Sequence, residues 1–344
     1  MKKKLILVCL CLVLSLALVA GCGGNQGAET QGTQGGTVTM MYTHGLGFES
    51  AEHWVALRFQ ELAYEFSNGR IVVQIFPADQ LGSEQRGFQD VQERVVQASA
   101  VTVNNITPFA PSVGFMDLPF IFHYYQEFYD VIDEVWDELN ERMIVESGNK
   151  AIAWYRQGFR NLTNSVRPVE TLEDLRGLRI RVPPNPMMLA AFESWGTNAT
   201  PIAWGETFTA LQYGIIDGQE NTHTVFNSMH FYETQRYLTE IRYKLWIGGV
   251  VVNNQWFLAQ DQDIQEAILR AGRQVSLEMR DHIEIMEGNA LANMLANGMI
   301  NNGPPRDEEL WMELAIATWP DLYDHMGGTA MLERAFEIID RDRP

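Results

Sequence analysis

The chain has 344 residues, with 25 Lys or Arg against 44 Asp or Glu, which gives a formal net charge of −19 at pH 7. This acidic balance argues against a protein that binds nucleic acid or an anionic membrane surface. All three cysteines lie within the first 22 residues, so a folded body held by disulfides or built around a catalytic thiol is also excluded.

The N-terminus is typical of an export signal. Three lysines at positions 2–4 precede the apolar run LILVCLCLVLSLALVA, and small residues lead directly to Cys22. The ending LVAGC resembles the lipobox of bacterial lipoproteins, in which the cysteine carries the lipid and becomes the mature N-terminus. We therefore expect a lipoprotein signal peptide over residues 1–21, lipid attachment at Cys22 and a flexible tether over residues 22–36. The alternative is an uncleaved membrane anchor, although a span needs about 20 apolar residues and this run is shorter.

The folded part begins near Thr37, and its first half alternates strands with helices. The expected strands are residues 37–44, 70–77 and 100–105, and the expected helices are residues 49–69 and 82–99. Strands separated by helices of this length predict a parallel sheet with helices on its faces, and ligands of such sheets bind at the carboxyl ends of the strands. His44 ends the first strand and is therefore a candidate pocket residue.

A second unit of alternating elements follows a helical stretch over residues 126–148. Its expected strands are residues 150–155, 178–183 and 199–204, with helices at 171–177, 186–196 and 205–214, and the run IIDGQEN follows at residues 215–221. Residues 247–258 predict a late strand that can return to the first sheet, and helical sequence dominates from Asp261 onward. We therefore expect an α/β fold of two lobes joined by crossing strands, each lobe a mixed or parallel sheet flanked by helices. Lobe I would comprise residues 37–157 and about 247–285, and lobe II residues 158–246 and about 286–344.

Motifs for nucleotide, metal or covalent chemistry are missing from this pattern. HGLGFES has the spacing of a dinucleotide-binding turn, but Ser50 replaces the third glycine, so a tight turn into a helix N-terminus is the better interpretation. The seven histidines show no spacing typical of zinc, and no nucleophile elbow, phosphate loop or glycosidase-type carboxylate pair can be singled out. We expect no metal, no cofactor and no enzymatic activity.

The run LRGLRIRVPP concentrates positive charge in an acidic chain. Along its strand the side chains alternate, so Arg179 and Arg181 share one face, and Pro183 ends the strand immediately beyond Arg181. A guanidinium at the carboxyl end of a strand can hold a carboxylate through two parallel hydrogen bonds. The alternative is a solvated face paired with local acids, which we expect for Arg176 at the end of a helix.

Several motifs occur in a fixed order along residues 158–238: GFRNLT, ETLEDLRGLRIRVP, TPIAWGETFTALQYGIIDGQEN and FYETQRYL. With NGRIVVQIFPADQLGSE and GFMDLPFIF upstream, they resemble the solute-binding proteins of tripartite ATP-independent periplasmic (TRAP) transporters, of the dicarboxylate-binding type. The resemblance implies a two-lobed periplasmic-binding-protein fold that closes over a small organic carboxylate. It also implies delivery of this ligand to the small and large membrane subunits of a TRAP permease, from a lipid-anchored position outside the cytoplasm.

The resemblance also implies roles for individual residues. In that family the arginine of the RVP strand, here Arg181, makes the bidentate contact to the ligand carboxylate, and the arginine of the GxR segment, here Arg160, supports the same anion. The last residue of DGQEN, here Asn221, hydrogen-bonds to the anion. Trp204 lines the cleft, and Glu220 orients an arginine rather than touching the ligand.

Departures from the family pattern leave the ligand open between a dicarboxylate and a sugar acid. Thr222 replaces a common proline, and Pro184 replaces a polar pocket residue of many relatives. Asn104 and Asn105 stand where some acidic-sugar binders have a carboxylate, and we include both, with His44, among the expected ligand contacts.

Two other functions remain as alternatives. An extracellular hydrolase acting on an anionic sugar could also use arginines and a two-lobed cleft. A binding protein of an ABC-type importer would share the cleft and the lipid anchor, but not the RVP and DGQEN motifs.

Overall fold

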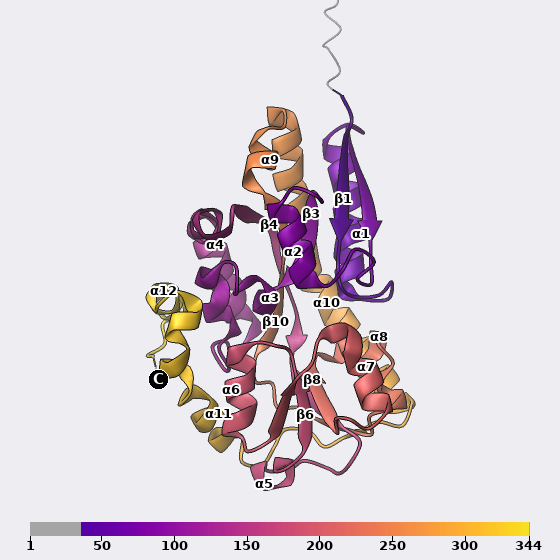
Figure 1. Ribbon diagram of the computed structural model, residues 1–344, viewed down its shortest axis with the longest axis vertical. Coiled ribbons are helices and arrows are strands. Elements are labelled where there is room, and N and C mark those ends of the chain that lie inside the picture. Colours follow the sequence, from indigo (N-terminus) through magenta and orange to yellow (C-terminus); the bar gives the residue numbers. More distant parts are fainter. Residues whose placement is uncertain (1–35, 344) are drawn as a thin grey trace, which may run out of the picture. The chain divides into compact units, whose positions relative to one another are not determined.

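The computed structural model of the chain describes residues 36–343 (Figure 1). These residues form one compact unit that contains two β-sheets with helices packed on them. The predicted signal peptide, the predicted lipid attachment site Cys22 and the tether up to residue 35 lie outside the described residues. Among residues 36–343, no helix is both long and apolar enough to cross a bilayer.

The first sheet consists of β1 (Val38–Thr43), β2 (Ile71–Phe76), β3 (Ala98–Thr102), β4 (Asn149–Phe159) and β10 (Leu245–Asn253). Its strand order is β2-β1-β3-β10-β4. β1 pairs in parallel with β2 and β3, as the alternation of elements predicts, whereas β10 runs antiparallel to β3 and β4. The late strand therefore returns to the first sheet, and the sheet is mixed.

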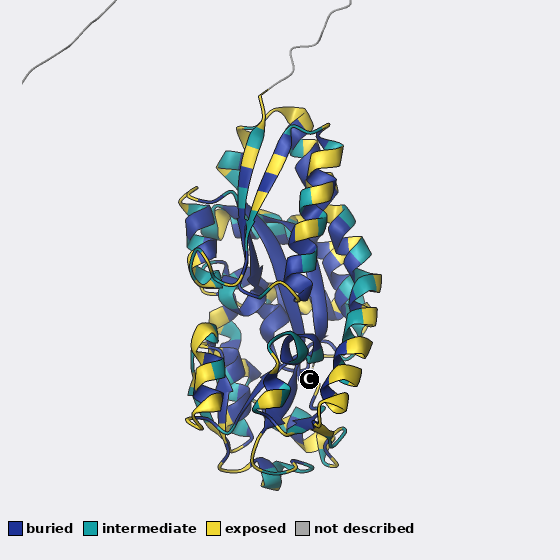
Figure 2. Ribbon diagram, turned by 90° about the vertical axis from the view of Figure 1, so that its right-hand side faces the viewer, coloured by how far each residue is buried: buried dark blue, intermediate teal, exposed yellow. Residues whose placement is uncertain are grey.

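Helices cover both faces of this sheet, and we call the whole assembly lobe I. Its helices are α1 (Ala51–Phe66), α2 (Glu84–Gln92), α3 (Val103–Ile106), the 3-10 helix η1 (Pro111–Asp117), α4 (Tyr125–Ser147) and α9 (Asn254–Leu258). Along β4, Trp154 packs in the apolar cluster shared with α2 and α4, while Tyr155 packs in the cluster shared with α1. Because successive side chains point to opposite faces, the strand is buried on both sides. Figure 2 shows the central strands of the sheet almost wholly buried.

The second sheet has the strand order β11-β9-β5-β8-β6-β7 and forms lobe II with its helices. Its strands are β5 (Asn161–Asn164), β6 (Arg179–Val182), β7 (Asn198–Pro201), β8 (Gly218–Asn221), β9 (Tyr237–Thr239) and β11 (Ile300–Asn301). Its helices are α5 (Leu172–Leu175), α6 (Pro186–Ser194), α7 (Trp204–Gln212), α8 (His223–Ser228), η2 (Phe231–Glu233) and α11 (Glu308–Ile316). β6 runs parallel to β7 and β8, so the carboxyl ends of these three strands share one edge.

Four segments join the lobes, one of them residues 317–318, which connect α11 of lobe II to the C-terminal helices on lobe I. β4 passes through Arg160 into β5, and β9 leads back through residues 240–244 into β10. The fourth segment is α10 (Gln262–Ala296), which packs against α1 and β4 of lobe I and against α8 of lobe II. On β4, α10 lies so close that a Cβ on Gly272 would be 2.0 Å from the carbonyl oxygen of Ile152. The predicted lobe boundary at residues 285 and 286 falls inside this continuous helix.

The C-terminal segment differs from the prediction, which placed residues 286–344 in lobe II. The 3-10 helix η3 (Trp319–Met326) and helix α12 (Ala330–Ile339) pack on η1 and α4 of lobe I (Figure 1). Leu332 and Phe336, four residues apart on one face of α12, join the same apolar cluster as α4. The periodicity of the sequence identifies this apolar face but not the surface that covers it.

Candidate ligand site between the two lobes

A cavity of about 130 Å³ lies between the lobes. In lobe I it is lined by Leu46, Asp79, Ser83, Glu84, Gln85, Thr102, Asn104, Asn105 and Trp246. In lobe II it is lined by Arg160, Arg181, Pro183, Pro184, Ala203, Trp204, Gly205 and Asn221. Asn221 ends β8 and Pro183 follows β6, so the lobe II lining comes from the shared carboxyl edge of parallel strands, where ligands of α/β sheets bind.

Arg181 is buried, with 2% of its surface exposed, yet no carboxylate of residues 36–343 lies within ion-pair distance of it. Its Nε donates a hydrogen bond to the carbonyl oxygen of Ile202 at 2.8 Å, and the centre of its guanidinium lies 5.7 Å from the ring of Trp204. Burial lowers the pKa of Arg181 to about 10, which still leaves the group charged at neutral pH. A buried charge without a counter-ion is costly, so an anion in the cavity would stabilise it.

Arg160 differs from Arg181 because it already has a partner. Its Nε and Nη2 donate to the two carboxylate oxygens of Glu220 at 2.5 and 2.7 Å, and Glu220 also accepts from the hydroxyl of Tyr243 at 2.8 Å. Burial alone would lower the pKa of Arg160, but the charge and hydrogen bonds of Glu220 raise it above its ordinary value. Glu220 thus holds Arg160 in place, and Arg181 supplies the uncompensated charge.

The other two arginines of the LRGLRIRVPP run lie outside the cavity. Arg179 is exposed and forms two hydrogen bonds to the carboxylate of Asp217, at 3.1 and 2.5 Å. Arg176 is exposed and lies 3.3 Å from a carboxylate oxygen of Glu173. The environment of each side chain, rather than its charge, therefore separates Arg181 from its neighbours.

Asn221 and Trp204 complete the lobe II side. Asn221 is buried, and its Oδ1 accepts from the backbone N–H of Thr222 at 3.0 Å, which turns the amide nitrogen away from that bond. Within the described part of the chain, this nitrogen has no hydrogen-bond partner. Trp204 is the first residue of α7 and is half-buried beside the cavity.

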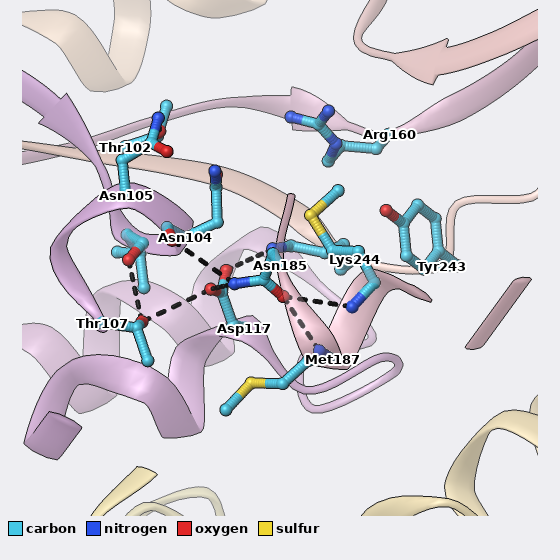
Figure 3. A network of polar contacts seen from close by, with 12 residues as sticks. Thr102, Asn104, Asn105, Thr107, Asp117, Arg160, Asn185, Met187, Tyr243 and Lys244 are labelled. Atoms are coloured by element: carbon cyan, nitrogen blue, oxygen red, sulfur yellow. Dashed lines mark hydrogen bonds and ion pairs between the residues drawn. The ribbon is translucent and has the colours of Figure 1, made fainter. Parts of the chain in front are cut away.

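Asn104 and Asn105 line the cavity from α3 in lobe I. Nδ2 of Asn105 donates to Glu84 at 2.8 Å, and the carbonyl oxygen of Asn104 accepts from Nδ2 of Asn185 at 3.3 Å. Asn185, the N-cap of α6 in lobe II, also donates to Asp117 of lobe I at 3.1 Å (Figure 3). The sequence did not identify Asn185, which joins the lobes next to the cavity.

His44 is the one predicted ligand contact that does not line the cavity. It is buried, with Nε2 3.1 Å from Nδ1 of His53 and Nδ1 3.6 Å from a carboxylate oxygen of Glu52. Burial lowers the pKa of His44 to about 4, so the ring is neutral at physiological pH. Within residues 36–343, no group of three or more His, Cys, Asp or Glu side chains is arranged to hold a metal ion.

Asp79 and Glu84 line the cavity although the sequence gave them no such role. Both follow β2, Asp79 in the loop and Glu84 as the first residue of α2. One oxygen of Glu84 accepts from the N–H and hydroxyl of Thr102, at 2.8 and 2.6 Å. The position of both acids after a strand could have indicated a place in the cavity. Residues 83–85, however, read equally well as the start of a helix, and α2 does begin there.

Residues 42–325 match the family described as bacterial extracellular solute-binding protein, family 7. The chain is 29% identical over 252 residues to the 2,3-diketo-L-gulonate-binding periplasmic protein of Escherichia coli, covering 70% of this chain and 76% of the relative. It is 24% identical over 308 residues to the C4-dicarboxylate-binding protein of Bacillus subtilis, covering 88% and 86%.

Among solved structures, the chain is similar to a TRAP periplasmic solute-binding protein from Rhodobacter sphaeroides in an open, ligand-free form. The two share 38% identity and a TM-score of 0.76, over 88% of this chain and 98% of the other. This likeness extends over both lobes, and the family match covers most of the described residues. The chain therefore belongs to the bacterial extracellular solute-binding proteins of family 7.

Proposed function

We propose that the chain binds one small organic carboxylate in the cavity between its lobes and delivers it to a TRAP membrane permease. The observation that carries the proposal is Arg181, a buried guanidinium that lines the cavity without a counter-ion among residues 36–343. Its two terminal nitrogens can donate parallel hydrogen bonds to a ligand carboxylate. Arg160 and Asn221 support the same anion from the neighbouring strands.

The closed surroundings strengthen this contact. A charged hydrogen bond is stronger where protein replaces water, because the effective dielectric constant is lower. Trp204 supplies an apolar wall on lobe II, and Asn104 and Asn105 supply amide groups on lobe I. Opening of the lobes would admit water and weaken the same contact, which gives a route for release.

The protein would act while anchored to the membrane through its N-terminus. Lipid attached to Cys22 would hold the receptor at the outer face of the membrane, and residues 22–36 would give it reach to the small and large permease subunits. The receptor would neither hydrolyse ATP nor change the solute.

The proposal is tested by a thermal-shift screen of the mature protein against sugar acids, dicarboxylates and keto acids. A ligand that binds only the folded state raises the melting temperature. We expect a carboxylate to do so, and we expect nuclear magnetic resonance to recover it unchanged after incubation. If no carboxylate raises the melting temperature, the binding function is contradicted. If a reaction product appears, the alternative of an extracellular hydrolase is favoured.

A further inference from the structure

Two acids face the cavity from lobe I, the side opposite the arginines. Asp79 lies in the β2–α2 loop and Glu84 begins α2, and both lie against the backbone of Gly45. A Cβ on Gly45 would be 3.1 Å from Oε1 of Glu84 and 3.2 Å from Oδ1 of Asp79. These two oxygens are therefore no more than 6.3 Å apart, the sum of the two distances.

Each acid has an oxygen that the described protein leaves without a hydrogen bond. Oε2 of Glu84 accepts from Thr102 and Asn105, but Oε1 accepts from no group of residues 36–343. Oδ1 of Asp79 is buried and has no partner there either. Neither acid forms an ion pair with a described Lys, Arg or His side chain. The lobe I side of the cavity thus presents acceptors and negative charge.

The surroundings of the pair oppose further negative charge. Burial raises the pKa of Glu84 to about 7, and Glu52 adds repulsion where it is itself ionised. Burial, followed by repulsion from Glu84 and from ionised Glu52, raises the pKa of Asp79 to about 7. His44 behind the pair is neutral, and Arg181, whose charge Glu84 stabilises, lies across the cavity in lobe II. No cation of lobe I offsets the acids.

We infer that Asp79 and Glu84 determine specificity by admitting a ligand whose far end donates hydrogen bonds and by rejecting one whose far end is a second carboxylate. This inference rests on the proposed function, since it assumes that Arg181 holds the first carboxylate. A hydroxyl or ammonium group at the far end would satisfy the free oxygens of the pair. A second carboxylate would place like charges together in a site with little water, which is how binding sites exclude a wrong ligand.

Matched pairs of ligands isolate the effect of the group at the end opposite the first carboxylate. Galactonate and galactarate, and gluconate and glucarate, differ only in a terminal hydroxymethyl group or carboxylate, and 4-hydroxybutyrate and succinate differ similarly on a shorter chain. We expect calorimetry at about pH 8 to show each hydroxyl acid that binds to be favoured by roughly 100-fold over its diacid. Comparing the affinity of 4-aminobutyrate with that of 4-hydroxybutyrate shows whether the acids prefer an ammonium or a hydroxyl donor.

Neutral substitutions test the two acids directly. Asp79→Asn and Glu84→Gln, singly and together, keep the size of the side chains, and Glu93→Gln on the exposed end of α2 is the matched control. We expect the double variant to bind diacids at least about ten times more tightly than the native chain does, while Glu93→Gln changes nothing. Retained binding of the hydroxyl acid shows that the variants are folded.

The pH dependence is a second readout. Protonation of the pair below its raised pKa removes the like charge, so the affinity of the native protein for a diacid should rise between about pH 8 and about pH 6. The double variant should lack this rise. Equal affinity for a diacid and its hydroxyl partner in the native protein, or a rise that survives in the double variant, would overturn the inference. If neither these seven acids nor any acid of the thermal-shift screen binds, the proposed function itself fails.

Discussion

Arg160 and Arg181 have the same side chain and line the same cavity, yet they have different physical roles. Glu220 neutralises Arg160, so removing the ligand leaves that guanidinium paired. Arg181 hydrogen-bonds to the carbonyl oxygen of Ile202 and lies beside the ring of Trp204, and no carboxylate of residues 36–343 is within ion-pair distance of it. A bound anion would supply the ion-pair partner that this buried charge lacks there.

Replacing Arg181 should separate binding from stability. We expect Arg181→Ala to weaken carboxylate binding by about 2–5 kcal/mol, the range for losing one partner of a buried charged pair. The unliganded protein should melt at nearly the same temperature or slightly higher, because an uncompensated buried charge is removed. Calorimetry and thermal melting measure the two effects. Arg179→Ala, two residues away and exposed, is the control, and native affinity in Arg181→Ala would refute the assignment.

At the scale of elements, α1 and the loop after β1 enclose a third acid, Glu52, which does not line the cavity. Glu52 is fully buried on α1, and one of its carboxylate oxygens accepts a hydrogen bond from the backbone N–H of Leu46 at 3.0 Å. Burial raises the pKa of Glu52 to about 8, despite the opposing effect of the backbone donors of Leu46 and Gly45. The folded protein therefore keeps a proton on Glu52 that the unfolded chain has released at neutral pH.

This proton makes stability fall as the pH rises. A raised folded-state pKa gives stability that is present at low pH and lost on approach to that pKa, so unfolding free energy should drop by about 1–2 kcal/mol from about pH 6.5 to about 8. His44 acts with the opposite sign, but only below about pH 6.5. Urea unfolding of Glu52→Gln should show a smaller drop, whereas Glu65→Gln, exposed on the same helix, should behave like the native chain. An unchanged drop in Glu52→Gln would contradict this explanation.

Individual elements show what the sequence could predict. The alternation of LRIRVP and the family motifs around it were enough to place Arg181 at the end of a strand, and the helix predicted over residues 171–177 is present as α5, with Thr171 as its N-cap. His44 was also placed correctly at a strand end, but that position does not specify which way the side chain points. Glu84 was recognised only as part of a helix start, because its approach to Gly45 depends on packing between distant segments.

At the scale of the whole molecule, the first and the last elements of the described residues both belong to lobe I. The folded residues begin with β1, and α12 near the C-terminus packs on α4, so lobe I contains both. A tether on the N-terminus would therefore hold lobe I and leave lobe II to change its orientation. The predicted order of anchor, tether and receptor fits this arrangement.

The anchor is tested by Cys22→Ala. Without the lipid-accepting thiol, the exported protein should appear in the soluble extracytoplasmic fraction, whereas the native chain should sediment with membranes and incorporate labelled palmitate. Cys11→Ala, within the predicted signal peptide, is the control and should remain membrane-bound. Equal membrane association of the Cys22 variant would favour the uncleaved anchor.

The contact of Gly272 with Ile152 has a mechanical consequence. An atom added at Gly272 would collide with the backbone of β4, so helix and strand are in direct backbone contact at this point. This close contact between α10 and β4 should resist sliding of the helix along the strand. A change in the angle between the lobes would therefore have to take place beyond this contact, in the segments that join the lobes, and one of these, from β4 into β5, contains the cavity residue Arg160.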